Sequence, residues 1–143
     1  MGKIKILFVV FGILAAFLVS FMGNVYLHEL GHYAAADHFG LNPEIKWENI
    51  EAGWSFRFET KAVAYTEFDK SDSDIEMFVV ALTGPLVNLV LGLIFLSIYV
   101  LKKDNVYVRM LVLTALVPCI FSFLMNVLPF NGTDGEFILN LFN

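Results

Sequence analysis

Three long apolar runs constrain this chain more than any other feature of its sequence. They extend over about residues 4–38, 76–101 and 106–128. A helix needs about 20 residues to cross the hydrocarbon core of a bilayer, so each run is long enough to span it. The first run exceeds that length, and it therefore predicts a tilted helix, a kink near Gly23 or end turns that lie outside the lipid.

The overall composition agrees with this interpretation. Charged residues make up 16% of the 143 residues, whereas soluble domains carry about 25%. The net charge of −5 argues against nucleic acid as a partner. Lys3 and Lys5 lie at the start of the first run, as in a signal peptide, but the run is too long and no small-residue cleavage site closes it, so we expect a retained anchor. The sequence predicts a mostly α-helical, single-domain integral membrane protein that crosses the lipid bilayer three times.

Between the first and second runs, the pattern of apolar residues changes to a period of two. Apolar and polar residues alternate over residues 44–48 and again over residues 54–59. We therefore predict a β-hairpin insertion at about residues 44–60, with its turn near residues 51–53. A third short strand at residues 62–66 is compatible with the same pattern. The hairpin either caps the helices or offers an edge strand to an extended substrate, and the sequence favours neither.

The end of the first run carries the sequence His28-Glu29-Leu30-Gly31-His32, called here the metal motif. Residues four apart on a helix share one face, so His28 and His32 can direct imidazole nitrogens at one metal ion. Glu29 lies about 100° further round the helix, where it can reach a water molecule on the metal without being a ligand. These are the groups of a zinc hydrolase.

The polar groups of the three predicted spans collect near one membrane face. The metal motif lies late in the first span, residues 84–88 lie early in the second, and residues 126–134 lie at the close of the third. The first span ends on the face where the second begins and the third ends, so these groups share one depth. Asp134 can then join His28 and His32 as a third ligand and leave a fourth tetrahedral position to water, as in catalytic zinc sites.

Each of these residues also has a purely structural interpretation. Two histidines at this spacing can pack between helices with a chance glutamate between them. Asp134 could cap the N-terminus of a short terminal helix, and Asn88 could hydrogen-bond between spans. Ionisable groups inside a membrane span are costly and usually functional, and this context favours the metal site over the structural alternatives.

Taken together, the motifs resemble the site-2 protease family of intramembrane zinc metalloproteases. The resemblance covers nearly the whole chain and rests on three motifs in the family's order: His28-Glu29-x-x-His32, Gly84-Pro85-x-x-Asn88, and Asn126-x-x-Pro129 followed by Asp134-Gly135. The predicted hairpin resembles the family's membrane-associated β element. Carried over to this sequence, the resemblance implies zinc ligands His28, His32 and Asp134, the general base Glu29, and the substrate-positioning or carbonyl-polarising residues Asn88 and Asn126.

The implied function is that of a zinc-dependent intramembrane endopeptidase, which hydrolyses peptide bonds in or near the transmembrane segments of membrane-protein substrates. Two alternatives use the same residues: a membrane-anchored zincin that cuts at the membrane surface, and a non-catalytic metal-binding membrane scaffold. A homo-oligomer and a regulatory membrane partner both stay open. The basic residues favour a cytoplasmic location for the face opposite the metal motif, whereas the resemblance places the active site near the cytoplasmic face, so the sequence does not decide the orientation.

Overall fold

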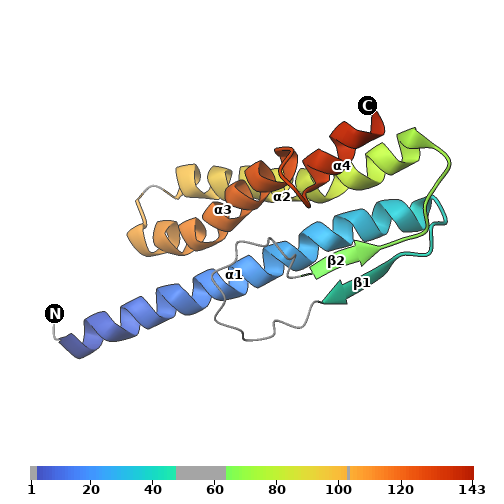
Figure 1. The fold of residues 1–143 in the computed structure, drawn as a ribbon. Helices are drawn as coiled ribbons and strands as arrows, with labels where there is room; N and C mark the ends of the chain where they lie inside the picture. Colours follow the sequence, from blue (N-terminus) through green and yellow to red (C-terminus); the bar gives the residue numbers. More distant parts are fainter. Residues whose placement is uncertain (1–2, 48–63, 103) are drawn as a thin grey trace.

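A computed structural model of the chain describes residues 3–47, 64–102 and 104–143. Three long helices lie side by side, a two-stranded sheet lies against the first of them, and a fourth, short helix follows the third (Figure 1). In chain order the elements are α1 (Lys3–His38), β1 (Glu44–Trp47), β2 (Ala64–Glu67), α2 (Asp74–Leu101), α3 (Val106–Val127) and α4 (Asp134–Leu141). The predicted mostly helical class with a β insertion between the first two spans is confirmed.

The three long helices have the surface of a membrane protein. Each is long and apolar enough to cross a bilayer. Large apolar side chains cover their outward faces, and Phe8 and Val19 of α1 are 74% and 73% exposed. Such a surface would be unstable in water, but in a bilayer it contacts lipid tails. The protein is therefore a multi-pass integral membrane protein.

Helix α1 is longer than a membrane span requires. Its 36 residues form an unbroken helix through Gly23, which at about 1.5 Å per residue is about 54 Å long. The kink considered for Gly23 is therefore not observed. The first turns of α1 extend past the ends of α2 and α3 (Figure 1), and the buried residues described in α1 all lie in its C-terminal half, from Asn24 onward. The metal motif lies in this packed half.

The sheet is antiparallel and lies beside the metal motif. The expected first strand is confirmed as β1, and it pairs with β2, which occupies the place of the third short strand, in a register that sets Ile45 opposite Thr66. The expected second strand and turn fall within residues 48–63, outside the described residues. Trp47 stacks on Tyr26 of α1 with ring centroids 6.3 Å apart. This contact anchors the sheet two residues before His28.

A glycine allows α1 and α2 to approach closely. A Cβ atom added to Gly31 would lie 2.9 Å from the Thr83 carbonyl oxygen and 2.9 Å from the Val87 side chain. Lipid tails are as apolar as helix side chains, so the hydrophobic effect does not drive membrane helices together. They gain packing energy instead from close van der Waals contact between their backbones, which small residues allow. Gly31 therefore sets the distance between the helix that carries the histidines and the helix that faces them.

We expect Gly31→Ala to destabilise the protein, because the new methyl group meets α2 backbone that cannot move away locally. Overpacking of this kind costs about 1–3 kcal/mol. The control is Gly12→Ala, which has no neighbouring atom within 4 Å of the added Cβ atom and makes the same gain in helix propensity. The thermal unfolding midpoint in detergent should fall for Gly31→Ala and hold or rise for Gly12→Ala. Equal midpoints would contradict the proposed close packing.

Candidate metal centre and cleft

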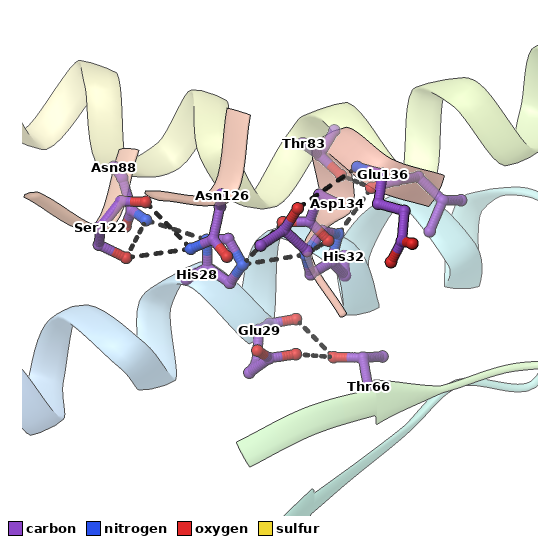
Figure 2. Close-up of polar contacts among 12 residues, drawn as sticks. His28, Glu29, His32, Thr66, Thr83, Asn88, Ser122, Asn126, Asp134 and Glu136 are labelled. Atoms are coloured by element: carbon purple, nitrogen blue, oxygen red, sulfur yellow. Dashed lines mark hydrogen bonds and ion pairs between the residues drawn. The ribbon is translucent and has the colours of Figure 1, made fainter. Parts of the chain in front are cut away.

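The three predicted metal ligands meet at one point. The Nε2 atoms of His28 and His32 lie 3.1 Å apart. Asp134, at the start of α4, places one carboxylate oxygen 3.2 Å from His28 Nε2 and the other 3.3 Å from His32 Nε2. Figure 2 shows the two imidazoles and the carboxylate directed at one another. Among the described residues, these three form the one group of His, Cys, Asp or Glu side chains close enough to hold a metal ion together.

Asp134 reaches this point because α4 begins directly against the end of α3. A Cβ atom added to Gly135 would lie 2.3 Å from the carbonyl oxygen of Val127, so only glycine allows this approach. Thr133, not Asp134, caps α4: its side chain accepts the N–H of Glu136 at 3.3 Å. The capping role considered for Asp134 is therefore wrong. Its carboxylate is free to face the histidines.

The geometry and chemistry of this group fit zinc. Zinc forms tetrahedral sites with bonds of about 2.0–2.1 Å to imidazole nitrogen and carboxylate oxygen, which gives ligand-to-ligand distances of about 3.3 Å. The three distances here are 3.1, 3.2 and 3.3 Å. Burial raises the pKa of the Asp134 carboxyl, but the hydrogen bonds and charges of the two imidazoles outweigh it and hold the pKa below its usual range. The third ligand is thus a carboxylate at neutral pH.

Helix α2 orients both imidazoles from behind. His32 Nδ1 donates to the carbonyl oxygen of Val80 at 2.7 Å. A carbonyl only accepts hydrogen bonds, so Nδ1 carries the proton and Nε2 of the neutral ring presents its lone pair to the centre. His28 Nδ1 lies 2.9 Å from the side-chain amide of Asn88, also on α2. Such partners on the far nitrogen are usual for metal-binding histidines.

Helix α2 also leaves room for the rings. A Cβ atom added to Gly84 would lie 2.3 Å from Nε2 and 2.5 Å from Cε1 of His32, and 2.8 Å from Cε1 of His28. Any side chain at position 84 would therefore occupy the space of the metal ligands. The close approach of Gly84 to His28 and His32 therefore explains why the second motif, Gly84-Pro85-x-x-Asn88, begins with glycine.

The two asparagines selected from the sequence take different places. Asn88 is fully buried and donates to the Ser122 hydroxyl at 2.8 Å. Asn126 donates to the Ser122 carbonyl oxygen at 3.0 Å and lines the cleft. Ser122 thus links the two asparagines to the back of His28 (Figure 2). Sequence reasoning missed Ser122, because a single serine in an apolar helix belongs to no motif.

The centre opens into a cleft of about 410 Å³, a size typical of ligand sites. One wall is β2 with the residue that follows it, and the other is the segment that leads into α4. The lining residues are His28, Glu29, His32, Ala64, Tyr65, Thr66, Phe68, Ala81, Asn126, Gly132, Thr133, Asp134, Glu136, Phe137 and Asn140. Asn88 does not line it.

Glu29 lies in this cleft and is not one of the ligands. Its side chain points from α1 towards β2, where the Thr66 hydroxyl lies 2.9 Å from the carboxylate Oε2 atom (Figure 2). The carboxylate is therefore beside the three ligands and free of the metal-binding group, as the spacing of the motif predicts. The arrangement suits a group that exchanges a proton with a reactant in the cleft.

A pair of helix-borne histidines, an aspartate and a separate glutamate, enclosed by apolar spans, are the groups expected of a membrane-embedded metallopeptidase. The sequence model for Peptidase family M50, the site-2 protease family, matches residues 16–108, which is more than half of the chain. The chain belongs to this family. No curated protein and no solved structure matches it. The family match includes the metal motif and Asn88 but ends before Asn126 and Asp134, so the position of Asp134 rests on the geometry described above.

We expect Gly84→Ala to abolish metal binding, because the added methyl group fills the space of both imidazoles. Gly92→Ala, on the same helix, is the matched control, since its nearest neighbours lie at an ordinary 3.7 Å. Zinc per chain, measured by mass spectrometry after metal loading and desalting, should fall to background for Gly84→Ala and equal wild type for Gly92→Ala. Full zinc content in Gly84→Ala would overturn this assignment of the centre.

Proposed function

We propose that this protein is a zinc-dependent intramembrane endopeptidase that hydrolyses peptide bonds in or near the transmembrane segments of membrane-protein substrates. The main support is the convergence of His28, His32 and Asp134 at zinc-like distances on a cleft beside the three spans. Membership of a metallopeptidase family points the same way. The scaffold alternative gains no comparable support, because a purely structural zinc site needs neither a cleft nor a free glutamate.

The ion would be held by Nε2 of His28, Nε2 of His32 and the carboxylate of Asp134. When bound, zinc supplies Lewis-acid chemistry, which activates a water molecule and polarises the scissile carbonyl. Three protein ligands leave one tetrahedral position open to reactants. The chain's part is to keep both Nε2 lone pairs and the carboxylate directed at the point where the ion would lie.

Glu29 acts as the general base and then as the general acid. It takes a proton from the attacking water and returns it to the leaving amine nitrogen, so that its own charge is restored after each turnover. A carboxylate can do this only if it lies beside the reacting atoms and binds no metal itself. Glu29 meets both conditions, since it lines the cleft next to the histidines and, among the residues that the structure describes, belongs to no group that could hold a metal ion.

The two asparagines divide the supporting roles. Asn126 lines the cleft, so its amide can hydrogen-bond a substrate carbonyl or the oxyanion that develops on it. Asn88 lies behind His28, away from the cleft, and holds that ring. If His28 binds the metal through Nε2, its Nδ1 carries the proton and needs an acceptor. Rotation of the Asn88 amide by a half-turn about its terminal bond places Oδ1 at that proton. Oδ1 has no other hydrogen-bond partner among the described residues.

The substrate must present an extended segment to this centre. A transmembrane helix keeps its carbonyls in internal hydrogen bonds, so it has to unwind before a peptide bond can react. Strand β2 borders the cleft, and an unwound segment aligned beside it could pair with its backbone by strand addition. This arrangement favours the substrate-binding role of the sheet over simple capping of the helices.

Glu29→Gln should abolish cleavage while zinc stays bound, because the amide keeps the shape of the side chain but cannot accept a proton. The assay uses purified protein in liposomes with a panel of single-span peptides whose spans contain helix-destabilising residues. Products identified by mass spectrometry also locate the cut relative to the bilayer. Turnover by Glu29→Gln would remove Glu29 from the mechanism, and cuts confined to segments outside the span would favour the surface zincin instead.

Asn88→Ala and Asn126→Ala should separate metal positioning from substrate contact. Loss of an outer partner of a metal ligand costs about 10–100-fold in metal affinity, so Asn88→Ala should weaken zinc binding by that factor in a chelator competition. Loss of an oxyanion donor costs about 10²–10³-fold in kcat, so Asn126→Ala should lower kcat with zinc affinity unchanged. The opposite pattern would exchange the two roles.

A further inference from the structure

Thr66 on β2 contacts both ends of Glu29. Its hydroxyl lies 2.9 Å from the carboxylate Oε2 atom and 3.0 Å from the backbone carbonyl oxygen of Glu29 (Figure 2). Both atoms are acceptors, so the single hydroxyl proton of Thr66 is donated to one of them or shared between the two. Among the described residues, no other side chain hydrogen-bonds the Glu29 carboxylate.

The position of Thr66 follows from the register of the sheet. Successive side chains of a strand point to opposite faces, and in β2 Ala64 and Thr66 are the less exposed pair, whereas Tyr65 and Glu67 are exposed. The stack of Trp47 on Tyr26 fixes the sheet against α1 close to the metal motif. The hydroxyl therefore reaches Glu29 through tertiary structure, across 37 residues of sequence.

The contact restrains a side chain whose direction decides whether it can work as a base. A glutamate has three rotatable side-chain bonds and loses much rotamer freedom when it is fixed. A hydrogen bond from a hydroxyl to a carboxylate is charge-assisted and stronger than a neutral one. Because the same hydroxyl also contacts the main chain of Glu29, it fixes the carboxylate relative to the helix that carries the metal ligands.

We propose that Thr66 is a positioning residue for the general base, and this inference rests on the proposed function. Its hydroxyl holds the Glu29 carboxylate in the direction needed to take a proton from the attacking water. A misplacement of about 1 Å can cost about 100-fold in rate. The strand beside the substrate cleft thus also sets the geometry of the reaction. The rival is that Thr66 only attaches the sheet to α1, which would affect stability and substrate binding rather than kcat.

The test compares three variants in the liposome assay. Thr66→Val keeps the shape of the side chain and removes the hydroxyl, and Thr66→Ser keeps the hydroxyl. Thr114→Val is the matched control, because Thr114 is a buried threonine of α3 whose hydroxyl, within the described part of the chain, hydrogen-bonds only the Leu111 carbonyl oxygen of its own helix, at 2.6 Å. Zinc content and unfolding midpoint are measured for every variant.

We expect Thr66→Val to lower kcat by about 10–100-fold, with KM, zinc content and unfolding midpoint near those of wild type. Thr66→Ser should recover most of kcat, and Thr114→Val should equal wild type. A raised KM with unchanged kcat, or a Thr66→Ser variant as slow as Thr66→Val, would overturn the proposal in favour of the attachment role.

A second measurement does not depend on turnover. In the metal-free protein, subtraction of the Glu29→Gln infrared spectrum isolates the carboxylate stretch of Glu29. Thr66→Val should shift this band, and Thr66→Ser and Thr114→Val should leave it in place. An unshifted band would contradict the contact itself.

The two proposals fail in distinguishable ways. If wild type cleaves no peptide of the panel, or if Glu29→Gln remains active, the proposed function is wrong, and an infrared shift would still establish the hydrogen bond. If wild type is active and Glu29→Gln is not, but Thr66→Val cleaves at the wild-type rate, only the role of Thr66 is wrong.

Discussion

The centre depends on the close contact between α1 and α2. Gly31 brings the two helices together, and Gly84 leaves space where the two imidazoles enter that contact. With the helices at this distance, α2 reaches the far nitrogen of each ring, through the Val80 carbonyl oxygen and the Asn88 amide. Such contacts are stabilising inside a membrane, because a polar group without a hydrogen-bond partner there is energetically unfavourable. The same residues of α1 and α2 therefore determine both how the two helices pack and how the metal ligands are oriented.

Much of this site can be predicted from the sequence, because it depends on helical period and topology. The spacing of His28 and His32 places them on one face of a helix. The number of crossings alone brings Asp134 to the same membrane face, and the structure sets its carboxylate 3.2 and 3.3 Å from the two rings. At the start of α4, the local sequence does not show which residue caps the helix. Thr133 and Asp134 are both common capping residues, and only the structure shows that Thr133 is the cap.

The supporting contacts were beyond sequence reasoning for a physical reason. The Val80 partner is a backbone carbonyl, which every residue has and no motif marks. Ser122 and Thr66 act through side chains brought near by tertiary packing, 34 and 37 residues from their partners. The pairing of β1 with β2 is likewise non-local, since an alternating pattern predicts strands but does not choose which two of them join. Period and topology thus locate the candidate metal centre, whereas the residues that support its ligands can be found only from the structure.

The placement of the third ligand on α4 makes the bound ion a cross-link. It would join α1 to a short helix about a hundred residues further along the chain, and closing so long a loop restricts the unfolded chain strongly. Helix α4 is too short to cross the membrane, and it is held in the bundle by packing against α2 and, at Gly135, against the end of α3. A bound ion would add to this packing, so that metal loading would also strengthen the attachment of the last helix.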